Sequence, residues 1–296
     1  MKNLSVSYKG ESDYLAVVDH GSFTIPTGKI TAIIGESGGG KTQTGLALAG
    51  LLPEYAKVNI NSKPPLDNYV ISFVFQDPLN ALNPIMKIGS QIREAFRKKI
   101  SNKQKNQILI QLLNDLEISD PKKRLTQYPH ELSGGMRQRI LIAMALARDP
   151  DILIADEPAT ALDMRTKHHI IELLKRIGKK SKKTIIYITH DLVSVRGFAD
   201  KILIMYAGKI VESGPAKMIF ENAKHPYSQR LIELMNKNVN NFGKLAYIEG
   251  HPPLSNDFPE GCRFHPRCGI AIPSCKSEEP GLNGSDNHWW ACPHQD

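Results

Sequence analysis

Two glycine-bearing segments and an acidic pair have the residue types needed for chemistry on a phosphate. The first segment runs from Gly35 through Glu36, Ser37, Gly38, Gly39, Gly40 and Lys41 to Thr42, and it matches G-x-x-x-x-G-K-[ST] in full. The second runs from Leu132 to Met136, and the acidic pair Asp156 and Glu157 follows it. One nucleotide needs a single cradle for its terminal phosphates. We therefore expect the second segment to close on a nucleotide that another subunit holds.

The first segment has the composition of an ATP site. Its glycines allow backbone N–H groups to turn inward around an anion, and the start of a following helix adds partial positive charge. Lys41 is expected to reach the β- and γ-phosphates, and Thr42 is expected to ligate Mg²⁺. This motif requires a strand before it and a helix after it. The sequence predicts both, over Lys29–Ile34 and Thr42–Leu52.

The acidic pair ends a short apolar run, Ile152–Asp156. We expect Asp156 to hold the magnesium ion through water and Glu157 to act as general base or to orient the attacking water. Two acids at the end of an ordinary strand would have the same pattern. The complete phosphate loop in the same chain favours the functional interpretation.

The second segment places Ser133, Gly134 and Gly135 just before a helix predicted from Arg137. A serine hydroxyl and open backbone N–H groups at a helix start form an anion site. The same residues also suit a plain N-cap, with Ser133 as the capping residue. The segment alone does not separate these two interpretations.

Apolar periodicity predicts alternating strands and helices. The predicted strands are at Leu4–Tyr8, Val17–Ile25, Lys29–Ile34, Val70–Gln76, Ile152–Asp156, Thr184–Thr189 and Lys201–Tyr206, and the helices are at Thr42–Leu52, Ile85–Ile100, Asn102–Ile118, Arg137–Arg148 and from Thr166. Val58–Asp67 is expected to be a loop or an irregular hairpin. The alternation predicts an α/β fold with a largely parallel sheet, and the helical stretch from about 78 to 149 predicts a subdomain.

The composition is that of a globular protein, with 41% hydrophobic and 23% charged residues. No stretch has the roughly 18 apolar residues of a membrane span, and residues 1–10 lack the apolar core of a signal peptide. We therefore expect a cytoplasmic protein, with any membrane role supplied by separate subunits. The net charge of +8 and the lysine runs are better explained by solvated surface than by a nucleic-acid or membrane face.

In this order, the motifs resemble those of the ATP-binding subunits of ABC transporters over most of the first 235 residues. Three further positions fit: Gln76 within Phe75–Pro78, Asp163 after Ala161–Leu162, and His190 within Ile188–Asp191. The resemblance implies a P-loop NTPase core of RecA-like fold with a helical subdomain, N-terminal antiparallel strands and a small cysteine-containing C-terminal appendage. It also implies ATP and Mg²⁺ as cofactors.

The resemblance assigns roles to single residues. Tyr8 would stack on adenine, Gln76 would sense the magnesium ion and the attacking water, and His190 would contact the γ-phosphate. The implied catalytic set is Lys41, Gln76, Glu157 and His190. Ser133, Gly134 and Gly135 would close over the ATP of a partner ATPase, and Asp163 would contact that opposite subunit.

The implied assembly is an importer at the cytoplasmic face of the cell membrane. Its partners would be a second, homologous ABC ATPase, two membrane permeases and an extracytoplasmic solute-binding protein, with no nucleic acid. Gln76–Gly89, His225–Tyr227 and Gly261–Cys268 look like segments of peptide and nickel importers. The expected solute is a di- or oligopeptide, nickel or a metal chelate, and the expected domains are 1–238 and 239–296.

Two departures from the family pattern stand out. Met136 occupies a position that is usually Gln in the wider family, although methionine is frequent in this subfamily. The region Leu52–Val70 is shorter than in such importers, so the antiparallel sheet beside the nucleotide is expected to be trimmed.

All four cysteines, Cys262, Cys268, Cys275 and Cys292, lie near the C-terminal end of the sequence. Four thiolates can bind zinc or an iron–sulfur cluster, but the C-x-x-C pairs typical of zinc sites are absent from the sequence. Disulfides are disfavoured in a reducing cytosol. The resemblance favours a [4Fe–4S] cluster over zinc or no metal.

The alternative function is an ABC-type ATPase outside transport, acting on nucleic acid or in iron–sulfur assembly. Chromosome-associated members carry a long coiled coil between the two glycine segments, whereas only about 90 residues separate Thr42 from Leu132 here. Translation-factor members carry two ATPase heads in one chain. The Gln76 segment and the cysteine appendage argue against iron–sulfur assembly.

Overall fold

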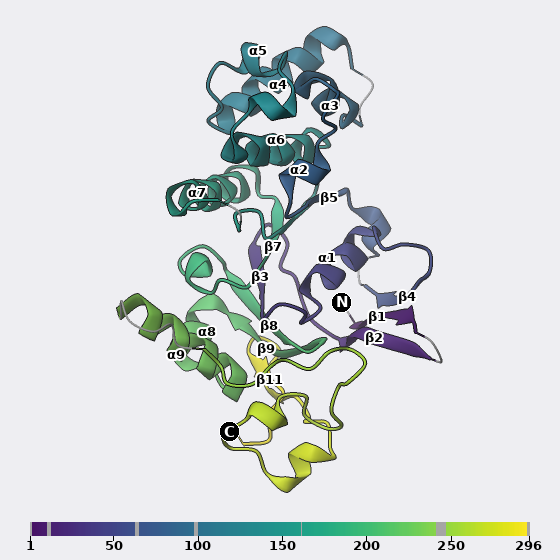
Figure 1. The fold of residues 1–296 in the computed structure, drawn as a ribbon, viewed down its shortest axis with the longest axis vertical. Helices are drawn as coiled ribbons and strands as arrows, with labels where there is room; N and C mark the ends of the chain where they lie inside the picture. The colour runs from purple at the N-terminus through teal and green to yellow at the C-terminus, as the bar shows by residue number, and fades with distance from the viewer. Residues whose placement is uncertain are drawn as a thin grey trace. The chain divides into compact units, whose positions relative to one another are not determined.

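The computed structural model describes residues 2–10, 13–62, 65–97, 100–160, 162–240 and 247–294. The chain divides into two units, the first made of residues 1–66 with 188–296 and the second of residues 67–187. The phosphate loop lies in the first unit, and the acidic pair lies in the second. Figure 1 shows the elements of both units.

An antiparallel sheet in the first unit contains β1 (Lys2–Lys9), β2 (Tyr14–Gly21) and β4 (Ala56–Asn61), in the order β2-β1-β4. Leu4 and Val6 of β1 are fully buried, as their alternation with polar residues predicts. The prediction of a loop or irregular hairpin at Val58–Asp67 is wrong for the residues of β4, whose side chains are mostly exposed and carry no apolar alternation. The sheet is therefore present despite the short connection.

The buried strand β3 (Ile30–Ile34) leads into the phosphate loop, and α1 (Lys41–Ala49) follows it. Strand β8 (Lys201–Tyr206) pairs in parallel with β3, and β9 (Lys209–Pro215) pairs antiparallel with β8. The tight turn between β8 and β9 uses Ala207 and Gly208, both at positive φ, as two-residue hairpins require. The bounds predicted for β8 are confirmed.

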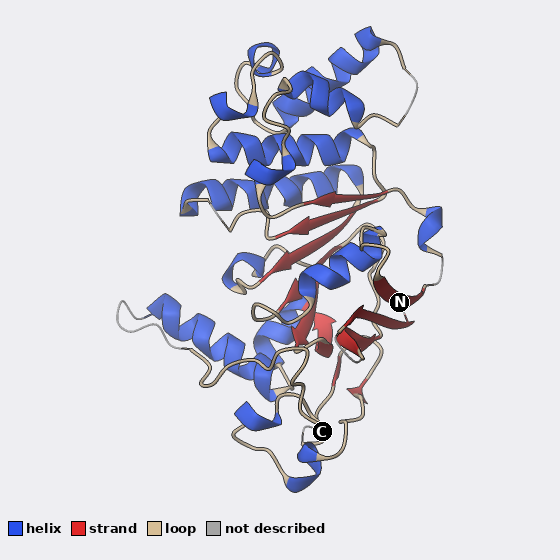
Figure 2. Ribbon diagram, turned by 45° about the vertical axis from the view of Figure 1, so that its right-hand side comes forward, coloured by secondary structure: helices blue, strands red, loops and turns tan. Residues whose placement is uncertain are grey.

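The C-terminal appendage joins this sheet through a short hairpin of β10 (Asn283–Gly284) and β11 (Trp289–Trp290), in which β11 pairs with β9. Helices α8 (Ala216–Asn222) and α9 (Pro226–Asn240) precede the appendage. Most of it is loop, as Figure 2 shows, with single turns of 3₁₀ helix at His265–Arg267 and Pro273–Lys276. Further single turns of this kind occur at Leu66–Asn68, Pro129–Glu131 and Val193–Val195.

The second unit combines strands with most of the helices. Strands β5 (Ile71–Val74) and β6 (Ile152–Asp156) pair in parallel, and β7 (Thr184–Thr189) begins here. The helices are α2 (Pro78–Ala81), α3 (Ile88–Glu94), α4 (Asn102–Asp115), α5 (Pro121–Arg124), α6 (Gly134–Ala147) and α7 (Met164–Ser181). Helix α6 contacts β5 as well as α2, α3 and α4 (Figure 1). Because α6 is covered on several sides, its sequence is apolar around most of its circumference.

The helix predicted over Ile85–Ile100 is shorter in the structure, where α3 covers Ile88–Glu94. The buried side chain of Gln91 accounts for the later start of α3. Its amide group makes hydrogen bonds with the backbone of Asn83 and Met86, and these hold residues 83–86 as a loop. Helices α2 to α6 fall within the stretch from 78 to 149 that we expected to be helical. The domain division at residue 238 stays a prediction.

Among the residues that the structure describes, no helix has both the length and the apolar character needed to cross a bilayer.

Candidate functional site

Close packing around the phosphate loop excludes side chains at two of its glycines. A Cβ atom on Gly35 would lie 2.1 Å from the Met205 carbonyl oxygen, and one on Gly40 would lie 2.8 Å from the Val17 carbonyl oxygen. Gly40 also has a φ of 91°, which favours glycine strongly. Gly35 and Gly40 are therefore required by the close approach of β8 and β2, respectively.

The first turn of α1 carries Lys41 and Thr42. The Lys41 side chain is buried, and its Nζ donates a hydrogen bond of 2.8 Å to the Glu36 carbonyl oxygen within the same loop. Thr42 is exposed. Gly40, the N-cap residue, has no side chain to cap the helix, so the first N–H groups of α1 face the loop, as in an anion site.

Two other expected residues belong to the same unit. The Tyr8 hydroxyl donates a 2.5 Å hydrogen bond to the Gln43 Oε1 atom, which places the Tyr8 ring beside the first turn of α1. Burial raises the pKa of Tyr8, and the nearby Tyr55 adds to this effect. His190 is exposed and directly follows β7.

The second unit brings Gln76 and Glu157 together. The Glu157 Oε2 atom accepts hydrogen bonds from Gln76 Nε2 at 3.3 Å and from Thr160 Oγ1 at 2.8 Å. Asp156, at the end of β6, is only 3% exposed. Glu157 itself has a φ of 43°, an uncommon conformation for a residue with a long side chain, and such strain is concentrated at functional sites.

Ser133 and Asp163 both act as N-caps in the structure. The Ser133 side chain accepts a hydrogen bond from the Met136 backbone N–H at the start of α6. Asp163 accepts hydrogen bonds from the backbone N–H groups of Arg165 and Thr166 at the start of α7. A hydrogen bond from the Thr166 hydroxyl is the largest cause that lowers the pKa of Asp163. Ser133, Gly134 and Asp163 are exposed, so the capping role leaves them accessible to another subunit.

The four cysteines are free thiols, two buried and two half-buried. Burial is the main cause that raises the pKa of Cys262 to about 11, and the charges of Cys275, Cys268 and Cys292 contribute to the same rise. Mutual effects of this kind show that the thiols share one neighbourhood. Within the described ranges, no three His, Cys, Asp or Glu side chains are grouped closely enough to hold a metal ion.

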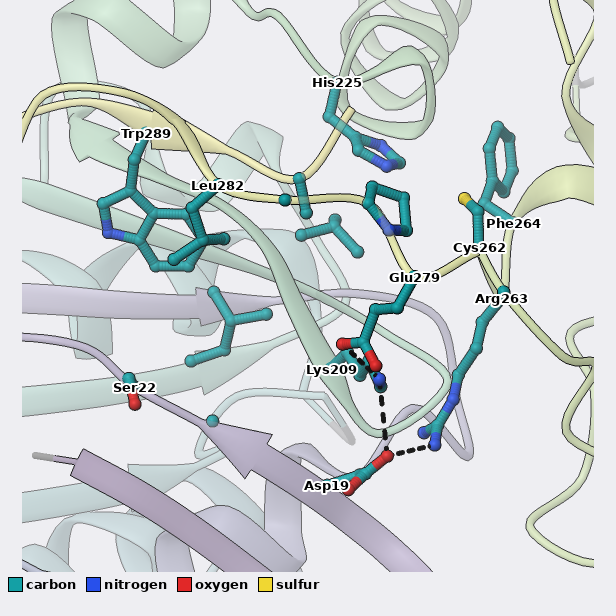
Figure 3. Close-up of a pocket in the computed structure, with 17 residues that line it drawn as sticks. Asp19, Ser22, Lys209, His225, Cys262, Arg263, Phe264, Glu279, Leu282 and Trp289 are labelled. Atoms are coloured by element: carbon teal, nitrogen blue, oxygen red, sulfur yellow. Dashed lines mark hydrogen bonds and ion pairs between the residues drawn. The ribbon is translucent and has the colours of Figure 1, made fainter. Parts of the chain in front are cut away.

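A pocket of about 290 Å³ lies in the first unit between β2, β9 and the appendage (Figure 3). Asp19 Oδ2 lies 2.5 Å from an Arg263 nitrogen and 3.4 Å from Lys209 Nζ, and Lys209 also pairs with Glu279. Leu282 and Trp289 line the apolar part. The two cations and two anions pair with one another, so this pocket shows no excess charge for a ligand.

Two residues with no role predicted from the sequence, Tyr227 and Arg267, contact the phosphate loop. The Tyr227 hydroxyl accepts a hydrogen bond from the Glu36 backbone N–H, and the Arg267 guanidinium pairs with the Glu36 carboxylate. The strings His225–Tyr227 and Gly261–Cys268 marked these segments only as subfamily features. Each of these contacts joins residues that lie far apart in the sequence, so no local sequence pattern predicts it.

Comparison with known proteins agrees with the motifs. Residues 18–160 match the family model of the ABC transporter, and residues 211–275 match that of the oligopeptide/dipeptide transporter, C-terminal region. The dipeptide transport ATP-binding protein DppD of Escherichia coli is 40% identical, over 95% of this chain and 91% of that protein. The oligopeptide transport ATP-binding protein OppD of Haemophilus influenzae is 39% identical, over 93% and 90% of the two chains.

Solved structures share the fold. The ATP-binding cassette MJ0796, in a dimeric post-hydrolysis state bound to ADP and phosphate, gives a TM-score of 0.61 at 27% identity over 73% of this chain and 97% of that chain. The cbiO1 protein of Clostridium perfringens, part of a cbiONQ transporter complex, gives 0.62 at 25% identity over 80% and 95%. The predicted P-loop NTPase fold is confirmed.

The fold and the phosphate loop together define an ATP-binding cassette ATPase. The chain belongs to the ABC transporter family, among the ATP-binding subunits that carry the oligopeptide/dipeptide C-terminal region. It is therefore an enzyme that hydrolyses ATP.

Proposed function

We propose that the chain powers the import of di- or oligopeptides through two membrane permeases. The observation that carries this proposal is the presence, in one chain, of a complete phosphate loop and of the C-terminal region characteristic of oligopeptide and dipeptide transporters. The relatives named for peptide transport favour peptides among the solutes that we expected. No observation favours nickel, a metal chelate, or a role outside transport.

In the proposed reaction, Lys41 holds the β- and γ-phosphates. Thr42 ligates the magnesium ion, and Asp156 holds it through water. Glu157 takes the proton of the attacking water or orients it. The hydrogen bond between Gln76 and Glu157 supports a shared role for these two residues. Tyr8 stacks on adenine, and its place beside α1 supports this assignment. His190 contacts the γ-phosphate.

A second, homologous ATPase completes the proposed assembly. Ser133, Gly134 and Gly135 of one subunit close over the ATP that the other subunit holds, and Asp163 contacts the opposite subunit. The exposure of Ser133, Gly134 and Asp163 supports this role. The pair of ATPases lies at the cytoplasmic face of the membrane, bound to the permeases, and an extracytoplasmic solute-binding protein delivers the peptide.

The segment Gln76–Gly89 is the proposed contact with the permeases. The side chain of Ile85 is 83% exposed, and it projects from the loop that the buried Gln91 holds in place. A single exposed apolar side chain is ordinary at a protein surface, so the proposal rests on the likeness of Gln76–Gly89 to the corresponding segment of peptide importers. Ile85→Asp should abolish peptide uptake while the uncomplexed chain binds ATP as wild type. Loss of ATP binding in this variant would contradict the assignment.

Reconstitution tests the proposal as a whole. The chain would be purified with the permeases and second ATPase encoded beside it and placed in proteoliposomes with the binding protein. We expect ATP hydrolysis to rise when a dipeptide is added with the binding protein, and labelled dipeptide to accumulate inside the vesicles. ATP hydrolysis without uptake of any di- or oligopeptide would contradict peptide import.

For the appendage, we propose that Cys262, Cys268, Cys275 and Cys292 hold a [4Fe–4S] cluster. Four free thiols in one neighbourhood fit such a group in kind. When bound, the cluster would tie the appendage loops together. Anaerobic purification with assays of iron, zinc and sulfide tests this, and a colourless protein with four titratable thiols would overturn it.

A further inference from the structure

We propose that Arg267 and Tyr227 are positioning residues of the nucleotide site, which together hold Glu36 and thereby the shape of the phosphate loop. Arg267 lies between Cys262 and Cys268 in the appendage, and Tyr227 lies in the first turn of α9. The inference rests on ATP binding by this loop and not on the identity of the transported solute. It assigns a task to the two segments that otherwise only mark the subfamily.

The contact between Arg267 and Glu36 is a two-pronged ion pair. Arg267 Nη1 lies 2.6 Å from Glu36 Oε2, and Nη2 lies 3.0 Å from Oε1. The Arg267 side chain is only 5% exposed, so solvent screens the pair weakly. A planar guanidinium fixes both the distance and the orientation of a carboxylate, whereas an ammonium group fixes only its distance.

The Arg267 guanidinium is itself held by its other hydrogen bonds. It donates from Nε to the Glu249 carbonyl oxygen at 2.9 Å, from Nη2 to the Ile248 carbonyl oxygen at 3.1 Å, and from Nη1 to the Tyr206 hydroxyl at 3.3 Å. Tyr206 ends β8, the strand that pairs with β3 immediately before the phosphate loop. The side chain is therefore anchored in both the appendage and the core sheet.

Tyr227 holds Glu36 from the backbone side. Its hydroxyl accepts a 2.9 Å hydrogen bond from the Glu36 N–H, and its ring is fully buried against Tyr206 and Phe264, at centroid distances of 4.7 and 5.4 Å. The buried His225 Nδ1 accepts from the Tyr227 N–H, and Pro226 starts α9. This arrangement explains the His-Pro-Tyr string as a helix start that aims the tyrosine at the loop.

All three polar groups of Glu36 are therefore engaged. Tyr227 accepts from its N–H, Lys41 donates to its carbonyl oxygen, and Arg267 pairs with its carboxylate. Glu36 lies directly after Gly35 and five residues before Lys41, within the stretch that would surround the phosphates. Because the two ends of the phosphate loop are joined through Glu36, releasing its carboxylate should loosen the loop and weaken nucleotide binding.

The coupling has to act in both directions. If the Cys262–Cys268 segment stabilises the nucleotide-binding shape of the loop, then bound nucleotide must stabilise that segment by the same free energy. This reciprocity separates a positioning role from a merely structural one, because a residue that only supports the fold would not transmit nucleotide binding to the appendage.

Affinity measurements on the full chain test the proposal with a non-hydrolysable ATP analogue and Mg²⁺. We expect Arg267→Met and Glu36→Gln each to raise the dissociation constant about tenfold, which lies within the usual range for coupled sites. The double variant should show about the same tenfold loss and not the product of the two. Arg267→Lys, which keeps the charge but loses the fork, should fall between wild type and Arg267→Met. The effect of the Arg267 variants should appear as a higher KM for ATP and much less as a lower kcat.

Glu279→Gln is the matched control. This variant removes the ion pair between Glu279 of the appendage and Lys209 of the core sheet. The Glu279 carboxylate does not contact the phosphate loop. We expect it to leave the dissociation constant unchanged. Wild-type affinity in folded Arg267→Met, or multiplicative losses in the double variant, would overturn the proposal. If Arg267→Met does not fold, wild-type affinity in Arg267→Lys would overturn the proposal instead.

Hydrogen exchange gives the readout that a structural role would not move. In wild type, the nucleotide analogue should slow amide exchange both in residues 35–42 and in residues 262–268. In Arg267→Lys, protection of residues 262–268 should be smaller than in wild type while residues 35–42 remain protected at saturating analogue. Equal protection of the appendage segment in both proteins would overturn the coupling. Neither the affinity measurement nor the hydrogen-exchange measurement depends on peptide transport. Failure of this inference can therefore be distinguished from failure of the proposed function.

Discussion

At the scale of single residues, Glu157 combines a left-handed backbone with two hydrogen-bond donors on one carboxylate oxygen, Gln76 and Thr160. Replacement by glutamine keeps the size of the side chain and removes its capacity to accept a proton. We expect Glu157→Gln to lower the ATPase rate of the assembled complex by at least about 100-fold, as loss of a general base does, while ATP affinity stays near wild type. Phosphate release and nucleotide binding would be measured on the same preparation. Hydrolysis at the wild-type rate would contradict the assigned role.

His225 makes stability depend on pH. Burial lowers its pKa to about 3, whereas the unfolded chain should bind a proton near pH 6.5. Between these values the unfolded state binds more protons, so the free energy of unfolding falls as the pH falls below 6.5. This residue alone should remove about 2 kcal/mol between pH 7 and pH 5.

The variant His225→Gln isolates this contribution. The glutamine cannot be protonated in this range, so its unfolding free energy should decline less steeply from pH 7 to pH 5 than that of wild type. Urea unfolding at several pH values measures both slopes. Equal slopes would show that His225 is charged in the folded chain or is accessible to water.

Residue types predicted the phosphate loop and the acidic pair because a complete motif lies within a few residues of sequence. The structure joins Gln76 and Glu157 by a hydrogen bond, and the roles that the resemblance gave them stay predictions. Arg267 and Tyr227 were missed because they meet Glu36 across 231 and 191 residues. The sequence carries no periodic pattern for a contact at that separation.

At the scale of helices and strands, buried segments were the most predictable. The bounds predicted for β7 and β8 are confirmed, because each is a continuous run of buried residues. Strand β4 was missed because its side chains are mostly exposed and its pairing with β1 alone defines it. Strand β9 was also not predicted, although the turn at Ala207 and Gly208 is the feature of the sequence that could have indicated a hairpin.

The cap of α7 separates a structural role of Asp163 from a role between subunits. Asparagine at an N-cap accepts the same backbone hydrogen bonds, whereas alanine cannot. We expect Asp163→Ala to lower the unfolding free energy of the chain, and Asp163→Asn to leave it nearly unchanged.

If Asp163 also contacts the opposite ATPase, both variants should weaken ATP-dependent pairing, since each removes the negative charge. Sedimentation of the chain with its natural partner and a non-hydrolysable analogue measures this pairing. If Asp163→Asn pairs with the partner as well as wild type does, the role of Asp163 is limited to capping α7.

At the scale of the whole molecule, the appendage shares the sheet and the aromatic core of the first unit. Strand β11 pairs with β9, and Phe264 packs on Tyr206 and Tyr227. The sequence predicted a cysteine-rich appendage from its changed composition. Its integration into the core could not be predicted, because β10 and β11 have two residues each and show no pattern of their own.

The tryptophans allow this integration to be tested in solution. The chain has only two, and both lie in β11 of the appendage, so tryptophan fluorescence reports on the appendage alone. The phosphate loop belongs to the same unit. Because a ligand stabilises whatever unfolds together with its site, a non-hydrolysable ATP analogue at 100 times its dissociation constant should stabilise this unit by about 2.7 kcal/mol. We therefore expect the tryptophan melting temperature to rise with the analogue in wild type. The rise should be smaller in Arg267→Met when both proteins receive the same analogue concentration. If the tryptophan melting temperature does not change with the nucleotide analogue, the appendage unfolds independently of the phosphate loop that Arg267 contacts.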